Sequence, residues 1–260
     1  MQDHERQAIA DELAVAHEER SVIPLLTTRH PDMTVEDSYA VQALWAERRI
    51  AAGRRVVGHK IGLTSKAMQQ ATGITEPDYG VILDDQVFDS GATLDFDAYS
   101  NVRVEVELAF VLGRPLQGPH CTIFEVLDAT DHIVPALEVL NSHIELDGRT
   151  IVDTIADNAA AAAMVTGGRV VRPMDIDLRW VAATLSKNGV IEESGVSAAI
   201  MGHPAMGIVW LANKLALHGI TMQPGHILLA GSFTRPTAIA AGDTIHADFG
   251  PLGAIGVSFS

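Results

Sequence analysis

Apolar and polar residues alternate most regularly between Val102 and Leu112, and this alternation predicts a β-strand. One face of the strand is apolar and consists of Val102, Val104, Val106, Leu108 and Phe110. Glu105 and Glu107 share the opposite face, with their Cα atoms roughly 6.5–7 Å apart. The segment alone leaves two interpretations open. It is either a half-exposed edge strand with a solvated acidic face, or a carboxylate pair that a divalent cation neutralises.

The N-terminal part of the chain, well before this strand, has helical periodicity. Helices are predicted over Gln2–Arg20 and Val35–Gly53, the second with Thr34 as its N-cap and Asp37 three residues on. The pattern then predicts a strand over Val56–Leu63, a short helix from Ser65 to near Gly73, a loop over Glu76–Gly80 and a strand over Val81–Leu83.

The middle of the chain contains segments with helical periodicity and segments with strand periodicity. Thr122 and Glu125 match a capping box that opens a helix toward Ala129. Ile133–Leu140 predicts a strand, and its internal proline indicates an edge or irregular strand because proline cannot donate to a ladder. The alanine-rich segment Val152–Ala163 predicts a helix.

The C-terminal part is rich in predicted strands. An Asn188-Gly189 turn predicts a hairpin between Trp180–Ser186 and Val190–Glu193, and a helix follows from Pro204 to His218. The last predicted strands are Ile227–Phe233, Thr244–Phe249 and Ile255–Phe259. We therefore expect an α+β fold with a mixed β-rich core. We expect a single domain over residues 1–260, with a small helical N-terminal layer over 1–54 and the catalytic core over 55–260.

The charge and composition of the chain exclude some classes of binding partner. The chain is 47% hydrophobic, with Lys+Arg 18 against Asp+Glu 33 and a net charge of −15, which argues against nucleic acid and anionic membranes. An anionic substrate stays possible because a bound metal reverses the local field. The single Cys121 excludes an intrachain disulfide. No apolar run approaches the ~20 residues of a membrane span and no signal peptide is evident, so we expect a cytoplasmic protein.

Glu138 is a third carboxylate in an unusual place, within the apolar segment Val134–Leu140. It either lies on the surface of an edge strand or is buried with a partner, because an unpaired buried carboxylate is costly. Three carboxylates from two strands would suit Mg²⁺ or Mn²⁺, and their spacing does not choose between these ions. Zinc is disfavoured because no His/Cys cluster accompanies the acids.

Lys60 is a second unusual residue, in an apolar strand between Gly58 and Gly62. Glycines there allow another backbone or a ligand to approach closely. A lysine in such a strand tends toward a lowered pKa, which suits proton transfer. The alternative is an ordinary strand lysine whose ammonium extends to water.

Other polar residues have simpler interpretations when taken alone. Asp78 follows a proline and is expected to form a turn, and Asp153 and Asp157 are expected to be a solvated or capping pair. Ser232, Thr234 and Arg235 lie in a loop that either binds a carboxylate or simply ends a strand.

Five motifs occur in order along the chain, namely Gly58–Thr64, Glu76–Gly80, Val104–Ala109, Pro135–Glu138 and Asp153–Asn158. Together they resemble the hydratase/decarboxylase family of aromatic meta-cleavage pathways, within the fumarylacetoacetase-like superfamily. The resemblance extends over nearly the whole chain. It implies a fumarylacetoacetase-like core and a homo-oligomer.

The resemblance also assigns roles to residues. It implies that Glu105, Glu107 and Glu138 bind Mg²⁺ or Mn²⁺ and that Lys60 and Asp78 are catalytic. Within the same motifs and the Gly231–Pro236 loop, we expect Leu63, Ser232, Thr234 and Arg235 to contact the substrate. Arg235 is the candidate for the distal carboxylate of a diacid.

The implied activity is metal-dependent addition of water to a small 2-oxo-alkenoate or 2-hydroxy-dienoate. The favoured reaction converts 2-oxohept-3-enedioate to 4-hydroxy-2-oxoheptanedioate. Alternatives that the motifs leave open are decarboxylation of 4-oxalocrotonate and hydration of 2-hydroxypenta-2,4-dienoate. A further alternative is a non-catalytic partner subunit, although the retained lysine and carboxylates argue against it.

Overall fold

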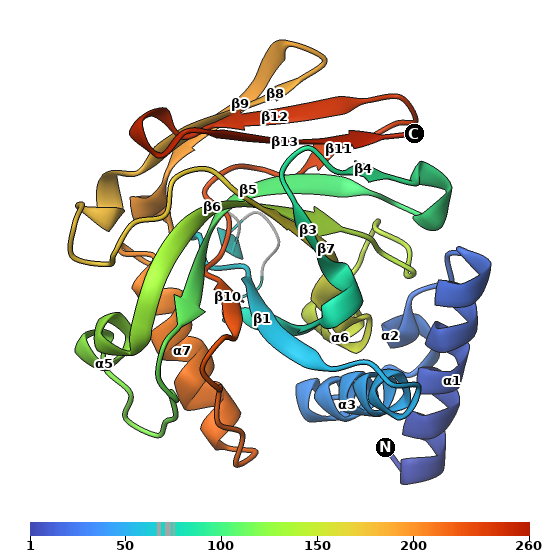
Figure 1. Ribbon diagram of the computed structural model, residues 1–260. Helices are drawn as coiled ribbons and strands as arrows, with labels where there is room; N and C mark the ends of the chain where they lie inside the picture. Colours follow the sequence, from blue (N-terminus) through green and yellow to red (C-terminus); the bar gives the residue numbers. More distant parts are fainter. Residues whose placement is uncertain (67–68, 71–73, 75) are drawn as a thin grey trace.

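Two β-sheets lie face to face in the computed structural model, and helices gather beside the larger sheet near the N-terminus (Figure 1). The structure describes residues 1–66, 69–70, 74 and 76–260. The expected α+β fold, a mixed β-rich core with a small helical layer, is confirmed. None of the helices within the described residues has both the length and the apolar character that crossing a membrane requires. The division of the chain at residue 54 stays a prediction.

The larger sheet has the strand order β2-β1-β10-β5-β6-β7-β3, and β11 also pairs with β5. Its strands are β1 (Val56–Gly62), β2 (Asp78–Leu83), β3 (Val87–Asp89), β5 (Arg103–Leu112), β6 (Thr130–Leu140), β7 (Ala161–Thr166), β10 (Ile227–Leu229) and β11 (Thr237–Ala238).

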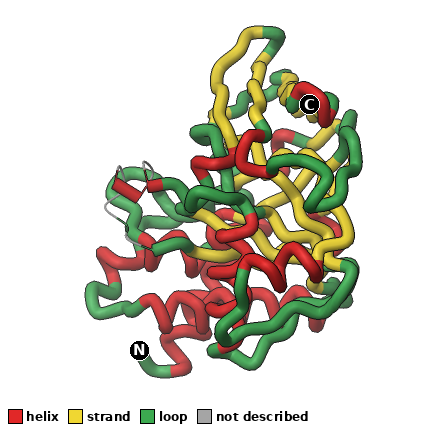
Figure 2. The backbone as a smooth tube through the Cα atoms, turned by 90° about the vertical axis from the view of Figure 1, so that its left-hand side faces the viewer, coloured by secondary structure: helices red, strands yellow, loops and turns green. Residues whose placement is uncertain are grey.

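The smaller sheet has the order β4-β13-β12-β8-β9. Its strands are β4 (Thr93–Leu94), β8 (Ala182–Lys187), β9 (Val190–Val196), β12 (Thr244–Asp248) and β13 (Ala254–Phe259). The hairpin of β8 and β9 turns at Asn188-Gly189 as predicted and projects from the body of the molecule (Figure 2).

The described helices are α1 (Asp3–Glu19), α2 (Leu26–Arg29), α3 (Val35–Ala51), α5 (Ile123–Ala129), α6 (Ile151–Ala156) and α7 (Ala205–Ala216). The capping boxes predicted at Thr34 and Thr122 are both present. The N-terminal helices share a small core that includes Ile9, Leu13, Leu26 and Val41. The short helix predicted from Ser65 to near Gly73 lies largely outside the described residues.

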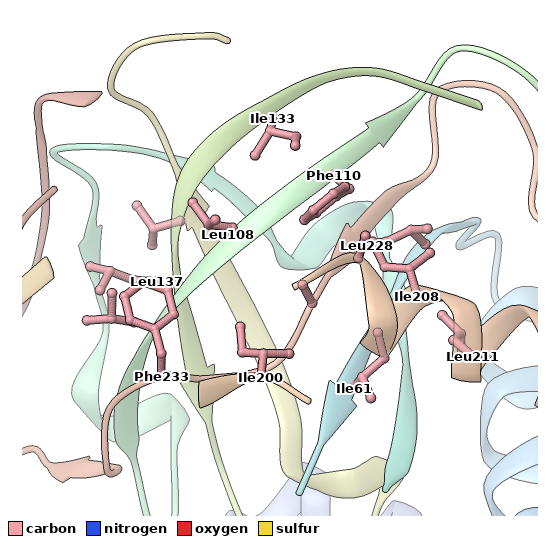
Figure 3. Close-up of a cluster of buried hydrophobic side chains, with 14 of the residues drawn as sticks. Ile61, Leu108, Phe110, Ile133, Leu137, Ile200, Ile208, Leu211, Leu228 and Phe233 are labelled. Carbon is pink, nitrogen blue, oxygen red and sulfur yellow. The ribbon is translucent and has the colours of Figure 1, made fainter. Parts of the chain in front are cut away.

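The alternation in β5 produces the two-faced strand that was predicted. Its apolar face enters the main core, where Leu108 and Phe110 lie with Ile61 of β1 and with Ile208 and Leu211 of α7 (Figure 3). The opposite face carries Glu105 and Glu107. Beyond them on this face is a smaller apolar cluster that contains Ala109, Ala136, Met164 and Leu229. The two faces thus separate the main core from the acidic side chains.

Of the two alternatives predicted for Ile133–Leu140, an edge strand is wrong, whereas an irregularity is present, because the pairing with β7 shifts register between Val139 and Leu140. This segment belongs to β6, which lies between β5 and β7 in the larger sheet. Pro135 is tolerated because β7 pairs only with Ala136–Leu140, so the proline lies beyond that ladder. A central β6 removes the interpretation of Glu138 as a surface residue.

The helix predicted over Val152–Ala163 is present only as far as Ala156. α6 ends at Ala156, a 3-10 turn follows over Asn158–Ala160, and β7 begins at Ala161. Asn158, Ala159 and Ala160 have φ values of 49°, 51° and 58°, so three successive residues adopt the left-handed conformation. The Asn158 amide holds this turn by accepting from the Val81 N–H at 2.8 Å and donating to the Val81 carbonyl at 2.9 Å. Tertiary contacts therefore override the helical preference of alanine.

Candidate functional site

Three glutamates converge on the acidic face of the larger sheet. Glu105 of β5 lies directly opposite Glu138 of β6 in the antiparallel register, and Glu107 is the next residue on that face of β5. One carboxylate oxygen from each of Glu105, Glu107 and Glu138 lies within 4.8 Å of the other two. Glu107 and Glu138 are buried, whereas Glu105 is half-buried. Sequence reasoning predicted this convergence.

The three carboxylates are poorly compensated within the protein. Burial, together with the charge of Glu138, raises the pKa of Glu105 to about 8, and the pKa of Glu107 is raised well above its usual range for the same reasons. Glu107 Oε1 and both carboxylate oxygens of Glu138 have no hydrogen-bond partner among the described residues. Buried oxygens that lack donors and repel one another fit a hard divalent cation.

Lys60 provides a positive charge beside this cluster. Its Nζ lies 3.2 Å from Glu138 Oε1, an ion pair without hydrogen-bond geometry, and only 3% of the residue is exposed. The expectation of a lowered Lys60 pKa is wrong for the protein alone. Burial favours a lower pKa, but the charges of Glu138, Asp78 and the other two glutamates outweigh it and raise the pKa. The ammonium is therefore the charged partner of the acidic cluster.

Asp78 lies close to Lys60 because Gly62 leaves room for it. It is the first residue of β2, paired with Gly62 of β1, rather than part of a turn. A Cβ at Gly62 would lie 2.2 Å from Asp78 Oδ1 and 3.3 Å from Lys60 Nζ, so only glycine fits between these groups. Burial raises the pKa of Asp78 against the opposing effect of Lys60. A carboxyl group with a raised pKa can hold a proton for transfer.

Backbone groups fix the orientation of Glu107. The Gly231 N–H donates to Glu107 Oε2 at 2.9 Å, and Gly231 has a φ of 113°. A Cβ at this position would lie 2.2 Å from Thr64 Oγ1. Glycine is required both for the backbone conformation and for the close packing. The loop after β10 thus supports the acidic cluster through its main chain.

A cavity of about 270 Å³ opens beside the cluster. It is lined by Lys60, Gly62, Leu63, Ile74, Asp78, Arg103, Glu105, Leu140, Leu146, Arg149, Thr154, Ala159, Ala160 and Pro236. Leu63 lines it with a left-handed φ of 56°, and residues of the strained turn at Ala159 and Ala160 form another wall. Strained backbone of this kind concentrates at functional sites.

Sequence reasoning missed the two arginines that line this cavity, Arg103 and Arg149. Arg103 could have been predicted from the strand pattern, because it lies two residues before Glu105 and therefore on the same face of β5. Arg149 carried no comparable signal, since it comes from the connection between β6 and α6. Burial lowers the pKa of both arginines, and Arg149 lowers that of Arg103 further.

The structure does not bring three of the expected substrate-contacting residues into the cavity. Ser232 Oγ donates to the carbonyls of Val106 and Thr234, and Thr234 Oγ1 accepts from the Val106 N–H. These two hydroxyls therefore bond to β5 in the stretch between its pairing with β10 and its pairing with β11. The Arg235 side chain is 76% exposed and pairs with Glu193 at 2.9 Å.

The aspartates of the α6 motif are structural. Asp153 caps α6 by accepting from the Thr150 N–H and also binds Thr27 N and Oγ1 of α2. Asp157 accepts from the His143 N–H at 2.7 Å. The capping expectation is confirmed, but neither side chain is solvated, because both residues are buried.

Comparison with known proteins places the chain in a family. The model described as "Fumarylacetoacetate (FAA) hydrolase C-terminal" matches residues 51–259. The chain is 48% identical over 262 residues to 2-oxo-hept-4-ene-1,7-dioate hydratase of Escherichia coli, covering 98% of both chains. It is 36% identical over 252 residues to 4-oxalocrotonate decarboxylase of Pseudomonas sp. (strain CF600), covering 97% of this chain and 96% of the relative.

A solved structure agrees over the whole fold. The 4-oxalocrotonate decarboxylase from Pseudomonas putida G7, complexed with magnesium and adipate, matches with a TM-score of 0.96 and 32% identity, covering 100% of this chain and 99% of that one. The matches in sequence and structure both span the acidic cluster and the strands that carry it. The chain therefore belongs to the fumarylacetoacetate hydrolase C-terminal family.

Proposed function

We propose that this protein is a divalent-metal-dependent hydro-lyase that adds water to a small 2-oxo-alkenoate or 2-hydroxy-dienoate in aromatic catabolism. The observation that carries the proposal is the carboxylate cluster of Glu105, Glu107 and Glu138, whose oxygens lie within 4.8 Å of one another beside Lys60. The favoured substrate is a seven-carbon 2-oxo diacid, which gives 4-hydroxy-2-oxoheptanedioate.

The three glutamates would hold Mg²⁺ or Mn²⁺, because both are hard cations that prefer carboxylate oxygens. Calcium is compatible with the same ligands, and the donor set alone does not choose between these ions. A cation bound there would supply Lewis-acid polarisation of the carbonyl group of a 2-oxo acid. The orphaned oxygens of Glu107 and Glu138 support this assignment.

Lys60 and Asp78 are the groups that move protons. In a 2-oxo-4-enoate, the C3 protons are acidic because they lie beside the ketone. One of the two residues takes a proton from C3, and a proton is delivered to C5, which yields the conjugated 3-ene. Water then adds its oxygen to C4 and a proton returns to C3, so that the product gains one water in total. The raised pKa of Asp78 suits a group that carries the proton between these positions.

This proton shift connects two substrate isomers. The sequence resemblance favoured 2-oxohept-3-enedioate, whereas the Escherichia coli relative is named for the 4-ene isomer. The isomers differ only by the position of one proton, at C3 or at C5. A site that contains both Lys60 and Asp78 can accept either isomer, and both lead to the same hydrated product.

Decarboxylation of 4-oxalocrotonate is the second candidate. The similarity to 4-oxalocrotonate decarboxylases, at 36% identity in sequence and a TM-score of 0.96 in structure, favours it. Loss of CO₂ from that substrate also needs an electron-withdrawing 2-oxo group in the same position. The higher identity to the hydratase, 48%, is why hydration is proposed first.

The deciding experiment compares three substrates with Mg²⁺ or with EDTA and identifies products by mass. The substrates are 2-oxohept-3-enedioate, 4-oxalocrotonate and 2-hydroxypenta-2,4-dienoate. Gain of water by the seven-carbon diacid, suppressed by EDTA, is the expected result. Loss of CO₂ from 4-oxalocrotonate as the main reaction would make the protein a decarboxylase. Failure to turn over any substrate with Mg²⁺ or Mn²⁺ would instead favour a non-catalytic partner subunit.

A homo-oligomer is part of the proposal. It rests on the family resemblance, and the exposed apolar residues Trp180 and Met174, 68% and 81% exposed, are candidates for the contact surface. Analytical ultracentrifugation of the full chain measures the assembly directly. A monomer at micromolar concentration would contradict this part of the proposal without affecting the proposed chemistry.

A further inference from the structure

Two arginines of the cavity form no ion pair among the described residues, although carboxylates lie near enough to act on their charges. Nine arginines form ion pairs with carboxylates, namely Arg6, Arg29, Arg48, Arg49, Arg54, Arg55, Arg114, Arg179 and Arg235. Within the described residues, Arg103 and Arg149 form none, although the chain has an excess of acidic residues. The other unpaired arginines, Arg20, Arg169 and Arg172, are exposed to solvent.

Arg103 and Arg149 are instead half-buried in one cavity. Arg103 Nε is shielded from solvent and has no hydrogen-bond partner among the described residues. Arg149 makes one side-chain hydrogen bond, from Nη1 to Ser142 Oγ at 2.9 Å. A shielded donor without an acceptor, such as Arg103 Nε, is costly, and the positive charges of the two arginines repel each other. Both features indicate that an anion completes this part of the site.

The position of Arg103 relative to the glutamates defines which anion fits. Arg103 and Glu105 share one face of β5, so their Cα atoms are roughly 6.5–7 Å apart. Six carbon–carbon bonds separate the two carboxyl carbons of a seven-carbon diacid, and an extended chain of that length spans roughly 7 Å. A substrate whose 2-oxo acid end lies at the glutamate cluster is therefore long enough for its other carboxylate to reach the part of the cavity that Arg103 lines.

We propose that Arg103 and Arg149 together bind the distal carboxylate of a dicarboxylate substrate and so determine the preference for diacids over monoacids. Guanidinium groups suit this role because their planar donors match the two oxygens of a carboxylate. Leu140, Leu146 and Pro236 line the same cavity and would contact the methylene part of the substrate. This inference rests on the proposed function, since it assumes that the 2-oxo acid end binds at the glutamates.

Arg235 is the competing assignment for the distal carboxylate. Its guanidinium already pairs with Glu193, and most of its side chain is exposed. Binding a substrate carboxylate there would require breaking that ion pair. Arg103 and Arg149 require no such change, so the structure favours them.

The test compares a diacid with a monoacid in four variants. Arg103→Met and Arg149→Met remove a guanidinium but keep an unbranched side chain, Arg235→Met tests the competing assignment, and Arg114→Met is the control at an exposed arginine. For each variant, kcat and KM are measured with Mg²⁺ for 2-oxohept-3-enedioate and for the monoacid 2-hydroxypenta-2,4-dienoate.

The proposal expects a selective loss. The ratio of kcat/KM for the diacid to that for the monoacid should fall roughly 10- to 100-fold in Arg103→Met and in Arg149→Met, mainly through a higher KM for the diacid. The ratio should stay unchanged in Arg114→Met and Arg235→Met. An equal loss on both substrates would mean a structural role and would overturn the proposal. A fall confined to Arg235→Met would overturn it in favour of Arg235.

A binding measurement separates this inference from the proposed reaction. Pimelate and heptanoate are saturated seven-carbon acids that differ by one carboxylate, and calorimetry with Mg²⁺ gives their affinities without any turnover. The wild-type chain should bind pimelate more tightly, and Arg149→Met should lose most of that difference while Arg149→Lys keeps part of it. If hydration occurs but pimelate binds no better than heptanoate, the arginine assignment fails and the proposed function stands. If no substrate is hydrated but the pimelate preference depends on these arginines, the arginine assignment stands and the proposed function fails.

Discussion

Glu105 on β5 and Glu138 on β6 lie directly opposite each other in an antiparallel pair, where like charges repel. Glu107 adds a third carboxylate, and among the described residues Lys60 is the one ammonium group that pairs with the cluster. Most of these groups are buried, so the repulsion is only weakly screened by water. The chain therefore maintains an arrangement that is unfavourable without a further positive charge. Such an arrangement is typical of a metal site.

Glu107→Gln should abolish metal-dependent turnover. The glutamine amide can still accept from the Gly231 N–H, so the loop after β10 keeps its anchor while one charged ligand is lost. We expect Mn²⁺ affinity, measured by calorimetry, to fall at least roughly 100-fold, which exceeds the usual effect of changing a group that only supports a ligand. Circular dichroism checks that the fold is intact. Full activity in this variant would contradict the metal assignment.

Metal removal should reverse the order of stability between the wild-type chain and Glu107→Gln. In EDTA the variant should have the higher melting temperature, because it removes like-charge repulsion among buried carboxylates. With Mg²⁺ at about 100 times its dissociation constant, the wild-type chain should gain about 2.7 kcal/mol from binding and become the more stable of the two. Differential scanning calorimetry measures both conditions. The same order in EDTA and in Mg²⁺ would argue against ligation by Glu107.

Lys60→Met should separate catalysis from metal binding. Loss of a proton-transferring group typically lowers the rate roughly 10²- to 10⁴-fold. The ammonium lies 3.2 Å from Glu138 and competes with a cation for that carboxylate, so Mn²⁺ affinity should stay the same or increase. Steady-state kinetics and calorimetry on the same preparation give both quantities. A loss of metal affinity as large as the loss of rate would assign Lys60 a structural role.

His59 should make the protein less stable in acid. Burial lowers the pKa of folded His59 to about 3, whereas an unfolded histidine has a pKa near 6.5. Below pH 6.5 the unfolded chain binds a proton that the folded chain does not, so the free energy of unfolding decreases as the pH falls toward 3. Between pH 7 and pH 5 this one residue should contribute a loss on the order of 2 kcal/mol.

His59→Leu tests that contribution. Leucine removes the titrating group from a buried position whose nearest ring neighbours are Tyr79 and His226. Denaturant unfolding at pH 7 and pH 5 should show a smaller pH effect in the variant than in the wild-type chain. His17, whose pKa burial lowers to about 4, continues to contribute in both proteins. An unchanged pH effect in His59→Leu would show that His59 is not the group responsible.

Asn158→Ala should destabilise the turn that ends α6. The substitution removes both hydrogen bonds to Val81 and leaves three left-handed residues without that support. A loss of roughly 1–3 kcal/mol is expected, measured by denaturant unfolding. Asn158→Asp is the matched variant, because it keeps an acceptor for the Val81 N–H but loses the donor to the Val81 carbonyl. It should lose at least as much stability as Asn158→Ala, because its buried carboxylate also repels the Val81 carbonyl oxygen.

The sequence by itself determined the features that follow from local periodicity. Alternation in β5 placed Glu105 and Glu107 on one face, because side chains two apart in a strand always point the same way. Capping boxes at Thr34 and Thr122 located two helix starts, since those hydrogen bonds form within a few residues. The ordered motifs around Lys60 and the glutamates also identified the family.

Only the tertiary structure decided how distant segments meet. The proline in β6 indicated an edge or irregular strand, but pairing with both β5 and β7 made the strand central and buried Glu138. The alanine-rich segment after Asp157 favoured a helix, but the bonds of Asn158 to Val81 and the pairing of β7 with β6 outweighed that preference. Arg149 lines the cavity from the connection between β6 and α6, where the sequence has no helical or strand periodicity. Such outcomes depend on contacts between residues far apart in the chain, which local propensity does not contain.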